Sequence, residues 1–254
     1  MQLTMLGVGS SAGTPVVGCN CATCLSDNPC NKRTRCSSLI TLDSGENILI
    51  DTGPDLRNQS LRENIKRVDA VLYTHTHADH LHGIDDLRAF CVIQRSQIPL
   101  YAKEDAVLHI TQKFGYTLRD PSDFWEMPVL RAETIDAPFE LFGMTVTPIP
   151  VMHGKSQIFG YRIGNIAYMT DVSEIPESSF PLLEGLDIVL LDCLREKSHP
   201  THINIEQSIS YISRIKAKQS YLIHMTHELE YASLSKKLPK DVFVGFDGLK
   251  LSVN

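Results

Sequence analysis

The hydrophobic and polar positions of this 254-residue chain form short β-rich runs that alternate with helical patterns and turns. The clearest helix is predicted at residues 204–215, where Asn204 can cap the first turn, Gln207 stands three residues on, and isoleucines recur at helical spacing. Further apolar runs predict strands at residues 38–42, 47–50, 70–73, 144–147, 166–169, 188–191 and 220–223. Together the pattern predicts a mixed α/β architecture.

The chain shows no sign of division into separate units. Residues 1–7 lack the basic region and long apolar run of a secretion signal, and they alternate like a first strand. No repeat or Pro/Gly/Ser-rich linker follows, so we expect a single domain over residues 1–254 with a small metal-binding loop at about 17–36. No run approaches the roughly 20 apolar residues that cross a bilayer. We therefore expect a cytoplasmic protein without a membrane partner.

The overall charge narrows the class of partner. A formal net charge of -6 argues against a protein that grips long nucleic acid, because such binding needs a basic surface. Lys32, Arg33 and Arg35 form a local basic cluster, which is either a solvated loop or a contact for one phosphate. A small molecule is the expected partner, and a homodimer remains open.

Residues whose side chains can bind metal ions or take part in catalysis follow directly after apolar runs at several predicted strand ends. In α/β folds these ends are where binding and catalytic groups gather. We therefore expect one shared functional site from the residues at these positions, which are Asp51, His75, His153, Asp171, Asp192 and His224.

Residues 75–80 read His-Thr-His-Ala-Asp-His and place three imidazoles and a carboxylate within six positions. In an extended segment His75 and His77 point to one side and can reach one cation, while a following turn or helix start carries Asp79 and His80 to a second. The pattern predicts two neighbouring metal sites. The alternative is a polar loop that is rich in histidine.

This motif, with a later His, Asp and His that each follow a strand, resembles the metallo-β-lactamase superfamily. The resemblance implies an αβ/βα sandwich of two mixed sheets flanked by helices, with the metal ions at one edge. It also implies that Asp51 orients a ligand histidine, with a turn cap as the alternative. The implied metal ligands are His75, His77 and His153 for one ion, Asp79, His80 and His224 for the other, and Asp171 as the bridge.

The cysteines add a second kind of metal site. Their odd number, seven, without a secretion signal fits a reducing compartment, and five of them lie between residues 19 and 36. Cys19, Cys21 and Cys24 supply three thiolates, whereas a structural zinc takes four ligands.

The fourth zinc ligand is implied by a closer resemblance. Around His224 the chain resembles a phosphodiesterase subfamily that acts on phosphoribosyl cyclic phosphate in the carbon-phosphorus lyase pathway. This resemblance implies that His227 completes a Cys3His zinc site. Cys30 is the alternative ligand, in which case His227 would be a surface residue.

The same subfamily has a histidine shortly before a helix that acts on the leaving group. His202 precedes the predicted helix at 204–215 and is the preferred match, while His199 is the alternative. His82 and His109 match no position of the family and are interpreted as helix or surface residues.

Two divalent ions about 3.5 to 4 Å apart clamp a phosphate and lower the pKa of a bridging water toward 7. We therefore expect a metal-dependent phosphodiesterase for small or cyclic phosphodiesters, in which a metal-bridging hydroxide attacks phosphorus. Asp79 would orient the nucleophile, and His202 would protonate the leaving alkoxide. Nitrogen and oxygen ligands suit Zn, Mn or Fe at the catalytic pair, whereas the thiolates select one structural Zn.

Other activities of the superfamily remain as alternatives. They are an RNA-processing nuclease, a lactonase, a thioesterase or β-lactamase, and a relative of the pyrroloquinoline quinone biosynthesis protein B. Residues 84–136 are expected to shape the substrate pocket.

Overall fold

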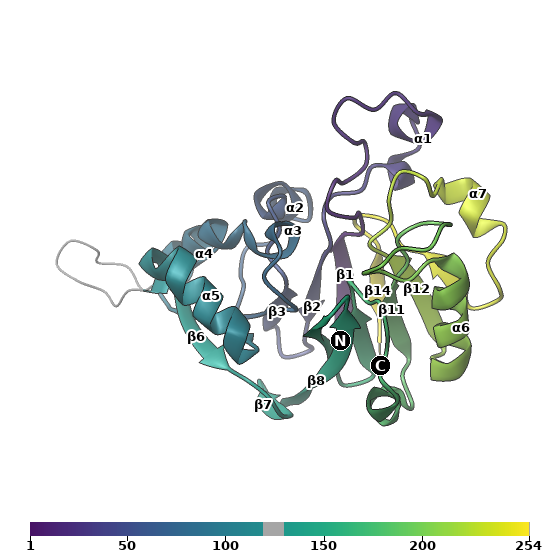
Figure 1. Cartoon of the computed structure of the whole chain (residues 1–254). Helices are drawn as coiled ribbons and strands as arrows, with labels where there is room; N and C mark the ends of the chain where they lie inside the picture. Colours follow the sequence, from purple (N-terminus) through teal and green to yellow (C-terminus); the bar gives the residue numbers. More distant parts are fainter. Residues whose placement is uncertain (119–129, 254) are drawn as a thin grey trace.

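A computed structural model describes residues 1–118 and 130–253 of the chain, and part of the segment expected to shape the pocket, residues 119–129, lies outside them. The described residues form two seven-stranded mixed sheets that are flanked by helices (Figure 1). The predicted αβ/βα sandwich is therefore confirmed. None of the described helices is long and apolar enough to cross a membrane.

The first sheet takes most of its strands from the N-terminal half of the chain. Its first four strands pair antiparallel, and the pairs from β3 to β6 are parallel. In sheet order its strands are β14 (Lys250–Ser252), β1 (Gln2–Gly7), β2 (Ser37–Thr41), β3 (Asn47–Ile50), β4 (Ala70–Leu72), β5 (Ile98–Ala102) and β6 (Leu130–Thr134). The helices of this half are α1 (Ala22–Leu25), η1 (Pro29–Asn31), α2 (Leu56–Arg62), α3 (Ala78–Leu81), η2 (Ile84–Asp86), α4 (Leu87–Gln94), α5 (Glu104–Phe114) and η3 (Gly115–Leu118).

The second sheet is antiparallel from β7 to β10 and parallel from β10 to β13. In sheet order its strands are β13 (Val242–Val244), β12 (Gln219–Ile223), β11 (Ile188–Asp192), β10 (Ile166–Met169), β9 (Ser156–Ile163), β8 (Met144–His153) and β7 (Phe139–Leu141). Its helices are η4 (Glu177–Leu183), α6 (Ile205–Ile215) and α7 (Tyr231–Ser235).

Two apolar clusters form the core. The larger one includes side chains from both sheets, and the smaller one packs the first sheet against α2, α4 and α5. Strand β1 contributes to both, because Leu3 and Met5 belong to the larger cluster and Leu6 to the smaller. Thr4 is also buried, so the alternation seen at residues 1–7 does not mark a solvent-facing side of the strand.

Strand β8 is longer than the run at residues 144–147 predicts, since it continues through Pro148 and Pro150 to His153. Strand β7 pairs with β8 only as far as Val146. Beyond that point β8 keeps β9 on one side and has no strand of the sheet on the other, so a missing proline N–H breaks no ladder hydrogen bond. The extension carries His153 to the end of the strand.

Helix α6 begins as the sequence predicts. Asn204 accepts a hydrogen bond from the backbone of Gln207, and the Gln207 side chain accepts one from the backbone of Asn204, both at 3.0 Å. Such a reciprocal cap satisfies two amides that the first turn otherwise leaves unpaired. The cap fixes the segment just before α6, where the candidate general acids lie.

Candidate metal centre

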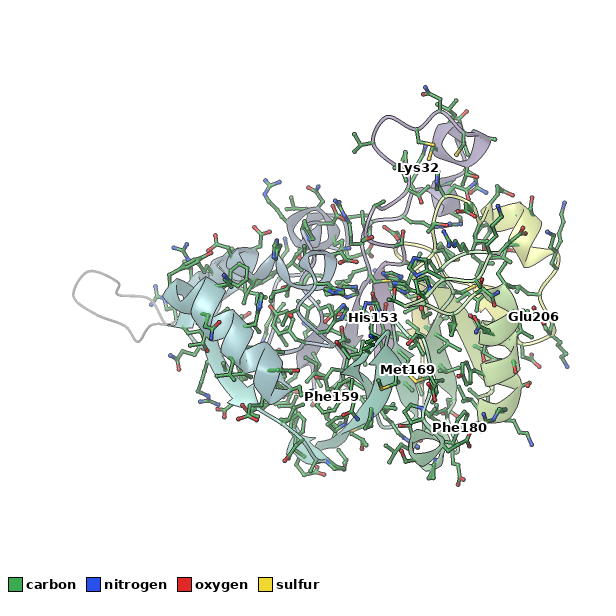
Figure 2. All side chains as sticks on the ribbon, in the orientation of Figure 1. Lys32, His153, Phe159, Met169, Phe180 and Glu206 are labelled. Atoms are coloured by element: carbon green, nitrogen blue, oxygen red, sulfur yellow. The ribbon has the colours of Figure 1, made fainter. Side chains whose placement is uncertain are left out.

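The predicted metal ligands come together at the strand ends of the two sheets. His75 follows β4, His153 ends β8, Asp171 follows β10 and His224 follows β12. Figure 2 shows His153 near the middle of the molecule, among a concentration of ring nitrogens. Residues that are up to about 150 positions apart in the chain thus share one site.

A first group of ligand atoms belongs to His75, His77, His153 and Asp171, which all lie within 4.8 Å of one another. Oδ1 of Asp171 is 3.8 Å from Nε2 of His75 and 3.9 Å from Nε2 of His153. His153 Nδ1 donates to the carbonyl oxygen of Thr201 at 2.9 Å, so its Nε2 stays unprotonated for a cation.

A second group consists of Asp79, His80, His224 and again Asp171. Oδ2 of Asp171 is 3.0 Å from Nε2 of His80 and 3.3 Å from Nε2 of His224. The short helix α3 carries both Asp79 and His80. Because each oxygen of Asp171 faces a different group, this carboxylate stands where a ligand shared by two ions would stand.

The chemistry of these residues fits two metal ions. In the described part of the chain, the buried Nε2 atoms of His75, His80 and His224 have no hydrogen-bond partner, which is costly unless another group meets them. Burial by itself lowers the pKa of His224, yet the neighbouring carboxylates, chiefly Asp171, raise it to about 10. The site therefore calls for added positive charge, and divalent ions would supply it to all of these ligands.

Asp51 holds one ligand in place. Its carboxylate is fully buried and accepts hydrogen bonds at 2.8 Å from the backbone N–H of Thr74, the hydroxyl of Thr74 and Nδ1 of His80. Nδ1 of His80 is thereby protonated and Nε2 is directed to the metal group. Asp51 serves this contact rather than a turn cap. Asp51, Asp171 and His224 all have φ near +60°, so the chain turns sharply where each strand ends.

Asp192 is a site residue whose role the sequence analysis missed. At the end of β11, its Oδ2 is 3.2 Å from Nδ1 of His202 and its Oδ1 is 3.4 Å from Nδ1 of His224. The two imidazoles stack with ring centroids 4.9 Å apart. The sequence signal was its place directly after an apolar run, and the parallel pairing of Asp192 with Ile223, the residue just before His224, brings it to the site.

His202 faces the metal groups, since its Nε2 lies 3.8 Å from Oδ1 of Asp171. His199 sits farther along the loop, where its Nδ1 contacts the hydroxyl of Thr201 at 3.2 Å, and it joins none of the ligand groups found among the described residues. The geometry favours His202 over His199 for contact with a substrate at the metals.

The two remaining histidines have different surroundings. The His82 ring packs edge-on against Phe114 with centroids 5.6 Å apart, which agrees with a helix-packing role. His109, on α5, is half-buried and lines a cavity that also reaches His77 and His153. Its position next to the metal ligands was not foreseen from the sequence.

The cysteine loop projects from the sheets and carries α1 (Figure 1). Nδ1 of His227 lies 3.3 Å from Sγ of Cys19 and 3.4 Å from Sγ of both Cys21 and Cys24. Tetrahedral zinc with ordinary Zn–S and Zn–N bonds separates such atoms by about 3.5 Å. The backbone N–H of Cys24 bonds Sγ of Cys21 and lowers the pKa of Cys21 to about 6, which favours the thiolate. Cys30 lies outside this group.

The basic cluster at residues 32–35 has structural partners. Arg33 is buried, and its guanidinium donates to the carbonyl oxygen of Thr226 at 3.1 Å. Arg35 forms an ion pair with Asp55 at 2.9 Å. These two side chains therefore hold the loop to the rest of the fold and do not form the solvated loop that was one reading of the sequence. Lys32 lies on the same projecting loop (Figure 2).

Comparison with known proteins agrees with the fold. A family model described as beta-lactamase superfamily domain matches residues 46–225. The chain belongs to this superfamily. The crystal structure of a new diphosphatase from the PhnP family is 41% identical in sequence, with a TM-score of 0.93 over 100% of this chain and 98% of that one. The predicted resemblance to this superfamily is confirmed.

Two other proteins are similar to this chain in fold or in sequence. Zn(2+)-bound PqqB from Methylobacterium extorquens has a TM-score of 0.80 at 20% identity, with both chains fully covered, which shows a shared fold. A protein named octanoyltransferase from Porphyromonas gingivalis is 38% identical over 261 residues, which make up 100% of this chain and 52% of that protein. The chain thus spans about half the length of this relative.

Proposed function

We propose that this superfamily member is a phosphodiesterase that hydrolyses small or cyclic phosphodiesters. The observation that supports this most is the position of His202. Its Nε2 is 3.8 Å from Oδ1 of Asp171, the carboxylate whose two oxygens face the two ligand groups. A group there can give a proton to an alkoxide that leaves a phosphate held at both metal groups. A lactone or a β-lactam also has a leaving group that takes up a proton, so the substrate comparison described below decides between these classes.

Different residues of the protein carry out the separate steps of the proposed reaction. Two divalent ions held by the two ligand groups would supply an activated water and balance the charge on the phosphate. Asp79 orients the attacking water and accepts its proton as the water oxygen bonds to phosphorus. As the bond from phosphorus to the leaving oxygen breaks, that oxygen takes the proton from Nε2 of His202. Asp192 holds Nδ1 of His202 and stabilises the ring while it is charged.

The donor atoms also suggest the metals. Imidazole and carboxylate ligands suit Zn, Mn or Fe at the catalytic pair, and the three thiolates select Zn at the cysteine loop. We propose Zn or Mn for the catalytic pair and one structural Zn.

The name of the diphosphatase relative, which shares 41% of its residues with this chain, supports a phosphoric ester or anhydride as the substrate class. A place in phosphonate metabolism rests on the sequence resemblance. The octanoyltransferase name belongs to a relative of which 52% is matched, so we do not extend acyl transfer to this chain.

The reaction class is tested with purified, metal-loaded protein and five substrates. These are bis-p-nitrophenyl phosphate, p-nitrophenyl phosphate, a diphosphate diester, a lactone and a β-lactam. We expect hydrolysis of the phosphodiester to be fastest and to vanish in His77→Ala, while His82→Ala, which lies outside the ligand groups, stays active. Faster turnover of the lactone, the β-lactam or the diphosphate would overturn the proposed class.

A further inference from the structure

A cavity of about 200 Å³ extends from the first metal group toward helix α5. Its lining includes His77 and His153 of the first metal group and also Lys103, Asp105 and His109. A group bound in this cavity would lie directly against ligands of the first metal group. None of the α5 residues has a part in the chemistry described above.

The charges in the cavity are already paired. Nζ of Lys103 is 3.1 Å from Oδ2 of Asp105 and donates to the carbonyl oxygen of Gln157 at 3.3 Å. Oδ1 of Asp105 accepts a hydrogen bond from the backbone N–H of Ala106 at 2.9 Å, which fixes the carboxylate at the start of α5. Lys103 and Asp105 together carry no net charge, so a phosphate placed there would gain little attraction from this pair.

Hydroxyl groups fit these surroundings better than an anion does. A hydroxyl donates one hydrogen bond and accepts others, so it can use a fixed carboxylate and a neighbouring ammonium at once. The walls mix hydroxyl and amide side chains, Ser156 and Gln157, with the apolar Ala106 and Ile158. Pockets for drug-sized ligands hold about 300 to 1,000 Å³, so this smaller cavity suits a single small group with carbon and hydroxyl faces.

The position of the cavity indicates which part of the substrate enters it. His202, which protonates the leaving oxygen in the proposed function, is absent from its walls, whereas His77 and His153 are present. We infer that the cavity is a specificity subsite for a neutral, hydroxyl-bearing group that stays attached to phosphorus, and that Asp105 and Lys103 recognise its hydroxyls. This inference rests on the proposed function and names its substrate class.

Three p-nitrophenyl phosphodiesters with one common leaving group test the subsite. The retained group is glyceryl in the first, propyl in the second, and glyceryl with a phosphate on its terminal hydroxyl in the third. We expect kcat/KM for the glyceryl ester to exceed that for the propyl ester by about tenfold, because the glyceryl hydroxyls can form hydrogen bonds with Asp105 and Lys103 that a propyl group cannot form. The phosphorylated ester should be slower than the glyceryl ester. Equal rates for glyceryl and propyl, or a preference for the added phosphate, would refute the subsite.

A matched pair of variants assigns the effect to the cavity. Asp105→Ala and Glu104→Ala each remove one carboxylate from the first turn of α5, but only Asp105 lines the cavity. We expect Asp105→Ala to abolish the preference for glyceryl over propyl and to improve the phosphorylated ester, while Glu104→Ala keeps the wild-type ratios. The same ratios in both variants would contradict a role for Asp105.

A binding measurement separates this inference from the proposed reaction. Calorimetry of the metal-loaded protein should show tighter binding of glycerol 1-phosphate than of propyl phosphate, and Asp105→Ala should remove the difference. If none of the three diesters is hydrolysed, the proposed function fails, and calorimetry still decides the subsite. Equal affinities for the two monoesters would overturn it.

Discussion

Oδ2 of Asp192 lies 3.2 Å from Nδ1 of His202, and Oδ1 of the same carboxylate lies 3.4 Å from Nδ1 of His224. One buried carboxylate therefore bonds the proposed acid and lies close to a metal ligand. Strands β11 and β12 run parallel, and this places Asp192 beside the strand end that carries His224.

Asp192→Asn keeps the size of the side chain but removes its charge. We expect kcat on an alkyl phosphodiester to fall by about 10- to 100-fold, a typical cost when a carboxylate that orients such a histidine is lost. The double variant with His202→Ala should be little slower than His202→Ala alone, since both changes affect one proton donor. Additive losses would mean that Asp192 acts mainly through His224, and elemental analysis would then reveal lost metal.

His202→Ala should leave the metal content unchanged and slow the hydrolysis of an alkyl or ribosyl phosphodiester by about 100- to 10,000-fold. The loss should be smaller on a p-nitrophenyl ester, because p-nitrophenolate leaves without a proton. Steady-state rates on both substrates, with metal analysis of the same samples, measure this difference. Equal losses would indicate that His202 binds phosphate, and full activity on both would transfer the role to His199 or to water.

The protein as isolated should hold about three metal ions per chain, of which two exchange and one is a tightly bound zinc. Cys21→Ser should lower the zinc content by about one equivalent and reduce the melting temperature, because zinc binding contributes to folding free energy. Cys91→Ser is a suitable control, since Cys91 is buried outside the cysteine site. An unchanged zinc content in Cys21→Ser would show that the cysteine loop does not hold a structural zinc.

In zinc-free protein, the pKa of Cys21 lies at about 6 because the backbone N–H of Cys24 stabilises its thiolate, whereas burial raises the pKa of Cys24 above its usual value. A lowered pKa means that the thiolate persists as the pH falls. Iodoacetamide should therefore alkylate Cys21 with a midpoint near pH 6, and Cys24 only at alkaline pH. Peptide mass spectrometry across a pH series gives both midpoints, and a shared alkaline midpoint would contradict the contact.

The sequence was sufficient where the signal is local. The cap of α6 needs only Asn204 and Gln207, and the motif at residues 75–80 places its ligands within one extended segment and one helical turn. The more distant ligands that join this motif were implied by the resemblance to the superfamily. In the structure, the strand ends bring those residues together. The cap of α6 and the motif at residues 75–80 depend on few contacts between remote parts of the chain.

Features that depend on long-range packing were not predictable in this way. Arg33 looked like part of a solvated basic loop, but its partner Thr226 is 193 residues away. Asp192 gained its role from the register of two parallel strands. His109 was placed on a helix or the surface, and only the fold brings it to a cavity that is also lined by metal ligands and by residues of β9.

Two residues separate His224 from His227, so one short stretch of backbone supplies a ligand to the catalytic pair and a ligand to the cysteine site. Arg33 ties the stretch between them to the projecting loop through Thr226. A zinc ion bound at the loop would therefore help to position His224. In a cell short of zinc, we expect a loop without its metal to position His224 less firmly. Scarcity of zinc would then also reduce metal binding at the catalytic pair.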